Sequence, residues 1–149
     1  MQENKFSADK IQIVDFKIIR GQIESPFEFE MSTIKGHTFN VEFHLGFSLQ
    51  ESLVKADFKV FVETNSTISI PEEAKGNFHF VYIFHVDNLS ELATYDSEDI
   101  LNVNGSLSNA LAAISHSTSR GILMTRFQGT ALENFIMPVI DPNDLLKDK

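Results

Sequence analysis

The segment Thr38–Leu49, with the sequence TFNVEFHLGFSL, carries the clearest structural pattern in the chain. Every second residue from Phe39 to Leu49 is apolar, and the residues between them are polar or glycine. Successive side chains of a β-strand point to opposite faces, so this period of two predicts a strand with one buried and one solvated face. A β-sheet is therefore expected as one layer of the fold.

Further alternating segments flank this one on both sides. Residues 54–62 and 78–86 repeat the pattern, and the short connection after Leu49 is typical of a hairpin. Residues 11–18 also alternate, with a slip of phase at Ile13 and Val14 that indicates a β-bulge. Together these segments predict four strands in a largely antiparallel sheet.

The pattern changes to that of helices after residue 87. Asp96–Asp99 places acids where the first turn of a helix favours them, and Ser106 is a candidate cap for a longer helix that ends at Gln128–Thr130. Asp141 and Pro142 predict the N-cap and first turn of a short final helix. Strands first and helices last predict an α+β fold, in a single domain over residues 1–149.

Composition restricts the partners and the compartment. The chain has 12 Lys and Arg against 21 Asp and Glu, a net charge of −9, so nucleic acid is not an expected partner. It has 14 Phe, no Trp and no Cys, which excludes disulfides. The N-terminal residues lack the apolar core of a signal peptide, and no segment is long and apolar enough to span a membrane. We therefore expect a cytoplasmic protein that does not insert into membranes.

Motifs for covalent chemistry are missing from the sequence. The five histidines lack the compact spacing of a metal site, and there is neither a glycine-rich phosphate loop nor a nucleophile elbow. The expectation is a protein without a metal ion or cofactor that is not an enzyme.

Two connecting segments, residues 26–34 and 127–138, contain more large apolar residues than surface loops normally carry. Two interpretations are open: the segments fold back over the core, or they line an apolar groove in which methionine adapts to varied ligands. The candidate ligand-binding residues are Phe27, Phe29, Met31, Ile34, Phe127, Leu132, Phe135, Ile136 and Met137.

The long helix has a face of mixed apolar and small residues. Small neighbours such as Ala110, Ala113 and Ser117 allow another helix or sheet to approach closely. We interpret this face as an interface between subunits, formed by Leu107, Leu111, Ile114, Thr118 and Gly121.

Three segments of the C-terminal half occur together in an order that resembles the SecB family of protein-export chaperones. They are Asn109–Ile122, Gln128–Thr130 and Met137–Asp141, and residues 11–26 are similar to the first strand of that family. The resemblance implies a four-stranded antiparallel sheet backed by the long helix and followed by a short final helix. It also implies dimers formed through the first strand, which pair through the long helices into a homotetramer.

The function implied by the resemblance is that of an ATP-independent holdase for unfolded preproteins. The family binds clients between the loop after the first strand and the C-terminal segment, and it delivers them to the export ATPase SecA, for which Glu24 is a candidate contact. Arg20 stands where the family carries an acid, which puts delivery to SecA in doubt. A SecB-like chaperone dedicated to an antitoxin or another specific client, and a carrier of a small hydrophobic ligand, are the alternatives.

Overall fold

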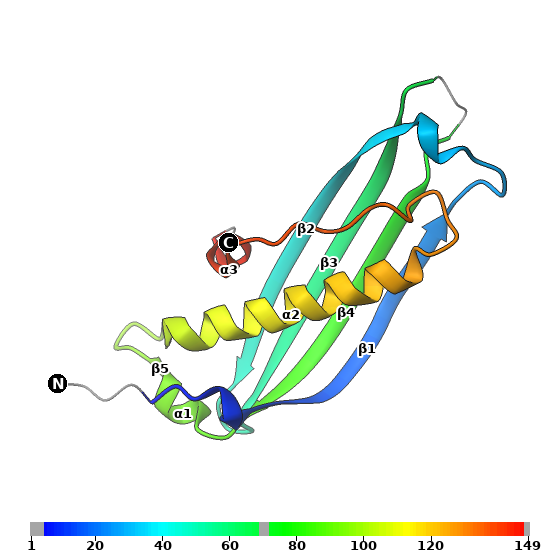
Figure 1. The fold of residues 1–149 in the computed structure, drawn as a ribbon. Coiled ribbons are helices and arrows are strands. Elements are labelled where there is room, and N and C mark those ends of the chain that lie inside the picture. Colours follow the sequence, from blue (N-terminus) through cyan, green and yellow to red (C-terminus); the bar gives the residue numbers. More distant parts are fainter. Residues whose placement is uncertain (1–4, 69–71, 148–149) are drawn as a thin grey trace.

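A four-stranded antiparallel sheet forms one layer of the molecule (Figure 1). The computed structural model describes residues 5–68 and 72–147. The strands are β1 (Ile11–Glu24), β2 (Ile34–Ser48), β3 (Leu53–Ser66) and β4 (Lys75–Val86). Their order in the sheet is β1-β4-β3-β2, so β1 and β2 form its two edges. The α+β class and the antiparallel sheet expected from the sequence are confirmed.

The pairing of β2 with β3 continues beyond the segments that the alternating pattern predicted. Phe43 lies opposite Phe58 in the ladder, and both side chains are buried on the inner face. The same ladder runs on to Ile34 opposite Ser66, although residues 34–37 lack clean alternation. Backbone hydrogen bonds to a neighbouring strand hold this end of β2, so the strand begins earlier than the side-chain pattern indicates.

The phase slip in β1 is a real irregularity of the ladder. The pairing of β1 with β4 shifts between Ile13 and Asp15, so Val14 is the extra residue of a bulge. A second shift lies between Ile18 and Arg20. Edge strands tolerate such bulges because only one side of the strand is paired.

Helix α2 (Gly105–Arg126) lies across the inner face of the sheet (Figure 1). Its buried residues recur at helical spacing on the face turned to the sheet: Leu107, Leu111, Ala112, Ser115, His116, Ser119 and Leu123. They meet the buried aromatic side chains of β3 and β4, and each large side chain buried here stabilises the fold by about 1.5–3 kcal/mol.

The segment before α2 differs from the expectation. A short helix α1 (Leu89–Leu92) is followed by the strands β5 (Ala93–Tyr95) and β6 (Leu101–Val103), which pair as a hairpin. The Asp96 carboxylate accepts hydrogen bonds from the backbone N–H groups of Ile100 and Glu98, and these bonds lower the pKa of Asp96. The prediction of a helix start at residues 96–99 was wrong, because an aspartate that bonds to the next residues of its own chain also makes a turn.

The caps of the two C-terminal helices follow ordinary capping chemistry. Asn104 caps α2, because its Oδ1 accepts from the backbone N–H of Leu107 at 3.1 Å; the expected cap, Ser106, lies inside the helix. Asp141 caps α3 (Pro142–Leu146), as predicted, and accepts from the N–H of Asn143 at 2.9 Å.

Residues 127–141, which we name the C-terminal connector, run back over the inner face from the end of α2 to α3 beside β2 (Figure 1). The ring of Phe135 lies 5.3 Å from that of His37 and 5.4 Å from that of Phe39, both in β2. The inner face is thus covered by α2, the connector and α3. Within residues 5–68 and 72–147, no helix is long and apolar enough to cross a membrane.

Gly76 tests the packing between β4 and the connector. A Cβ added at Gly76 would lie 2.8 Å from a carbon of the buried Phe127 ring, whereas one added at Gly46 would meet no atom within 4 Å. We predict that Gly76→Ala lowers the free energy of unfolding by about 1–3 kcal/mol, and that Gly46→Ala leaves it unchanged or raises it. Urea denaturation of both variants measures this; equal effects would contradict the packing described.

His116 makes stability depend on pH. Burial lowers its pKa from the ordinary value of 6.5, and the nearby charge of Arg120 lowers it further. Below pH 6.5 the unfolded chain binds this proton while the folded chain resists it, so stability falls as the pH drops toward the folded-state pKa. We predict a smaller loss of unfolding free energy between pH 7.5 and 5.5 in His116→Gln than in the wild type. An identical loss in both proteins would contradict the role of His116.

Candidate functional site

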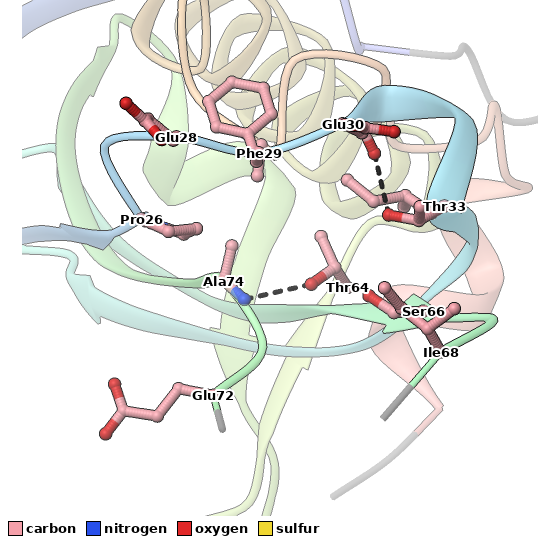
Figure 2. A pocket seen from close by; sticks show the side chains of 12 residues that line it. Pro26, Glu28, Phe29, Glu30, Thr33, Thr64, Ser66, Ile68, Glu72 and Ala74 are labelled. Atoms are coloured by element: carbon pink, nitrogen blue, oxygen red, sulfur yellow. Dashed lines mark hydrogen bonds between the residues drawn. The ribbon is translucent and has the colours of Figure 1, made fainter. Parts of the chain in front are cut away.

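A cavity of about 380 Å³ opens at the end of the sheet where β1 ends and β2 begins (Figure 2). The residues that line it come from the loop after β1, the start of β2, the end of β3, the β3–β4 connection and the C-terminal connector: Pro26, Glu28, Phe29, Glu30, Thr33, Ile34, Thr64, Ser66, Ile68, Glu72, Ala74 and Ala131.

The strand order explains why a cavity forms here. β1 and β2 are consecutive in the chain but lie on opposite edges of the sheet, so residues 25–33 must cross the ends of β4 and β3. Crossing three strand spacings requires about 14 Å of span, which nine residues provide easily. The crossing loop therefore stands off from the strand ends and encloses space beside them.

Hydrogen bonds tether the crossing loop at both of its ends. The Ser25 hydroxyl accepts from the backbone N–H of Ala131 at 2.9 Å, which joins the loop to the C-terminal connector. At the other end, the backbone N–H of Thr67 donates to the carbonyl of Thr33 at 2.7 Å. The short 3₁₀ turn Met31–Thr33 lies between these tethers. The cavity walls are thus held in place without a ligand.

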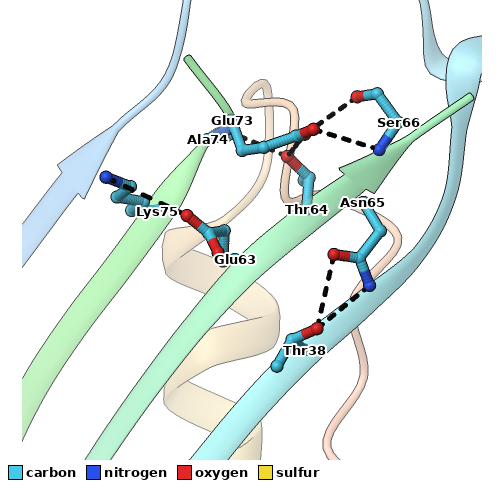
Figure 3. A network of polar contacts seen from close by, with 8 residues as sticks. All are labelled: Thr38, Glu63, Thr64, Asn65, Ser66, Glu73, Ala74 and Lys75. Carbon is cyan, nitrogen blue, oxygen red and sulfur yellow. Dashed lines mark hydrogen bonds and ion pairs between the residues drawn. The ribbon is translucent and has the colours of Figure 1, made fainter. Parts of the chain in front are cut away.

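A polar network fixes the β3–β4 connection on the far wall (Figure 3). The hydroxyls of Thr64 and Ser66 donate to the Glu73 carboxylate at 2.7 Å and 2.8 Å, and the Thr64 hydroxyl accepts from the backbone N–H of Ala74 at 2.9 Å. The hydrogen bond from Thr64 is the main cause of the lowered pKa of Glu73. Glu73 therefore stays ionised near neutral pH and serves to hold the wall.

The cavity is apolar inside and acidic at its rim. Phe29, Ile34 and Ile68 supply large apolar surface, and the carboxylates come from Glu28, Glu30 and Glu72. Among the described residues that line it there is no lysine or arginine, and the described part of the chain has no group of three His, Asp or Glu that could hold a metal ion. Such a site accommodates an apolar group and repels anions.

The crossing loop brings part of the predicted binding set to this cavity. Phe29 and Ile34 line it. Phe27 is 98% exposed, between two lining residues, and projects away from the core. Met31 is partly buried in the 3₁₀ turn and is not among the lining residues.

The structure shows which of the two interpretations applies to the large side chains of the C-terminal connector. Its large side chains Phe127, Leu132, Phe135 and Met137 are buried in the core, whereas Ile136 is exposed. The alternation from Phe135 to Met137 lets two side chains pack under the connector and directs the third to solvent. For these four buried residues the first interpretation, packing on the core, is the correct one, and the connector gives the cavity only Ala131.

The face of α2 interpreted as a subunit interface divides in two. Leu107 and Leu111 are fully buried against the sheet, so they belong to the core rather than to an open interface. Ile114 is partly buried, and Thr118 and Gly121 are exposed on the outer side of α2. Glu24 is exposed at the end of β1, opposite Lys75.

The cavity wall formed by the end of β3 and the β3–β4 connection was not among the predicted binding residues. Ile68 is 55% exposed at the cavity, and Thr64 and Ala74 line it from below. At Ile68 the available signal was an apolar residue in the connection between the predicted strands 54–62 and 78–86. The sequence carries no such signal at Thr64 and Ala74, because the pairing of the strands is what brings these two residues to the cavity.

The connector yields a direct test of these burial assignments. Leu132→Ala removes a fully buried side chain, and we predict that it lowers the free energy of unfolding by about 2–5 kcal/mol. Ile136→Ala alters an exposed residue of the same connector, and a change within about 0.5 kcal/mol is expected. Chemical denaturation of both variants measures the difference; a larger loss in Ile136→Ala would overturn the assignment.

The fold resembles that of a chaperone of known structure. The chain is similar to the Mycobacterium tuberculosis Rv1957 SecB-like chaperone, solved in complex with a ChAD peptide from the Rv1956 HigA1 antitoxin. The TM-score is 0.56 and the sequences are 14% identical, with 89% of this chain and 93% of that chain covered. No protein-family model and no curated protein matches the sequence. The likeness at this identity is one of fold: the chain has the architecture of a SecB-like chaperone.

Proposed function

We propose that this protein is a chaperone that binds apolar segments of unfolded polypeptides in the cavity beneath the crossing loop, without ATP and without covalent chemistry. The observation that carries the proposal is the cavity itself. It is apolar, preformed and placed at the end of the sheet of a SecB-like fold.

Burial of client side chains supplies the binding energy. Each Å² of apolar surface removed from water contributes about 25 cal/mol, and a tethered loop loses little entropy when a client binds. Phe27, fully exposed on the same loop, adds apolar surface next to the cavity. The acids at the rim of the cavity favour clients that carry basic residues next to the bound apolar side chain, since opposite charges attract.

The comparison favours a chaperone that serves one dedicated client over a general export chaperone. The structural neighbour was solved in complex with a peptide from an antitoxin. Binding of preproteins for export, contact of Glu24 with SecA, and assembly into a homotetramer stay predictions from the resemblance. Of the five α2 residues predicted to form such an assembly, Ile114, Thr118 and Gly121 are still available, since Leu107 and Leu111 face the sheet.

A carrier of a small hydrophobic ligand is the second candidate. A cavity of about 380 Å³ falls in the range of small-molecule sites. Native mass spectrometry separates the two: a protein that retains a lipid-sized adduct favours the carrier, and one that captures an added unfolded polypeptide favours the chaperone.

If clients bind in the cavity, a charge placed there should weaken client binding. The chain has no Trp, so fluorescence of an apolar peptide with one Trp and two flanking Lys reports on the peptide alone. Ile68→Asp places a carboxylate at the cavity and should raise the Kd of this peptide at least tenfold, which is about 1.4 kcal/mol. Suppression of the aggregation of a denatured client should fall in parallel.

Val139→Asp is the matched control. Val139 is 79% exposed, lies in the C-terminal connector and does not line the cavity, so this variant changes charge and apolar surface in the same way. It should bind the peptide like the wild type. Equal loss in both variants, or no blue shift of the Trp emission with the wild type, would refute the site.

A further inference from the structure

The outer face of the sheet, turned away from α2, carries a row of basic side chains across three strands. Arg20 of β1 lies opposite His79 of β4, and His79 lies opposite Lys59 of β3. His79 alternates with the buried Phe78 and Phe80, and Arg20 and Lys59 are its direct partners on the neighbouring strands, so the three side chains point to the outer face. The chain as a whole has a charge of −9, so a basic row is a local exception.

The row surrounds a hollow of about 190 Å³. It is lined by Ile19, Arg20, Lys59, Asn77, Phe78 and His79. The bulge between Ile18 and Arg20 lies at this point of β1, where the extra residue is Ile19. The strand irregularity thus contributes an apolar side chain and a guanidinium to one concave site.

Nearby acids do not neutralise the hollow. Asp57 is engaged by His79, whose Nε2 lies 2.7 Å from the Asp57 carboxylate, and by Lys55 at 3.9 Å. Among the residues that the structure describes, neither Arg20 nor Lys59 forms an ion pair, although Glu42 lies opposite Lys59 on β2. Two cations are therefore left to receive an external anion.

Apolar surface adjoins the charged groups. Ile19 is 59% exposed at the edge of the hollow. Phe61, which is partly exposed on β3, lies opposite Asn77, a residue of the hollow. A ligand that combines a carboxylate with a neighbouring apolar side chain would satisfy both kinds of surface.

We propose that this hollow is a docking site for an acidic segment of a partner polypeptide, with an Asp or Glu side chain between Arg20 and Lys59 and an apolar neighbour on Ile19 and Phe61. The site is separate from the client cavity. It lies on the outer face between β1, β4 and β3, whereas the cavity lies at the end of the sheet below the crossing loop.

Charge decides between a polypeptide and a nucleic acid as the partner. An extended polyanion meets the repulsion of the other carboxylates of a chain with net charge −9. A short acidic segment interacts mainly with charges within the screening length, which is about 8 Å at physiological salt, so the local basic residues outweigh the distant acids. The apolar rim adds contact for a polypeptide side chain and none for a phosphate.

The test uses a fluorescein-labelled peptide with two Glu-Leu pairs and measures its anisotropy against the wild-type protein. Arg20→Gln/Lys59→Gln removes the two unpaired cations and should raise the Kd about tenfold or more, since a hydrogen bond to a charged group is lost at each position. Both side chains are exposed, so the variant is expected to fold. Lys5→Gln/Lys10→Gln, a pair of exposed lysines elsewhere with the same change of net charge, should leave the Kd unchanged.

Two further measurements test whether the acidic peptide binds in the hollow. A peptide with Gln in place of Glu should bind at least tenfold more weakly, and Ile68→Asp, which alters the client cavity, should leave binding of the acidic peptide unchanged. Equal affinity of the two double variants would overturn the proposal. So would binding of the Gln peptide as tightly as the Glu peptide, or tighter binding of a single-stranded oligonucleotide than of the acidic peptide.

Discussion

Burial of the aromatic inner face of the sheet beneath α2 is the interaction on which the rest of the structure depends. The rings of Phe58, Phe80 and Phe84 are fully buried there, opposite a helix whose Leu111 and Leu123 are equally inaccessible. One polar contact sets the position of helix on sheet: the Tyr82 and Ser119 hydroxyls lie 2.7 Å apart, and burial raises the pKa of Tyr82 to about 12. Half of the 14 phenyl rings of the chain are buried in the core.

This commitment determines where binding can take place. With the inner face covered by α2 and the C-terminal connector, the concave apolar surface offered to a client lies at the end of the sheet. The strand order supplies it, because placing β1 and β2 on opposite edges forces residues 25–33 to cross the strand ends. The candidate site is thus a consequence of topology, and only the residues that fill it, such as Phe29 and Ile34, are matters of local sequence.

The same distinction explains which features could be predicted from the sequence. Strands with strict period two, the bulge at Val14 and the cap at Asp141 depend on neighbours in the chain, and their patterns indicate them directly. Spacing shows that Leu107 and Leu111 share a face, but not whether a sheet or a second subunit covers it. The apolar content of the C-terminal connector was equally ambiguous, and only the packing of Phe135 on His37 resolves it.

Methyl NMR can test whether an unfolded chain is held in the cavity beneath the crossing loop. An unfolded client with basic residues is added to protein with labelled Ile and Ala methyl groups. We expect chemical-shift changes at Ile34, Ile68, Ala74 and Ala131, which line the cavity. Shifts confined to the outer face of the sheet, at Ile19 and Ile83, with those four methyl groups unmoved, would contradict it.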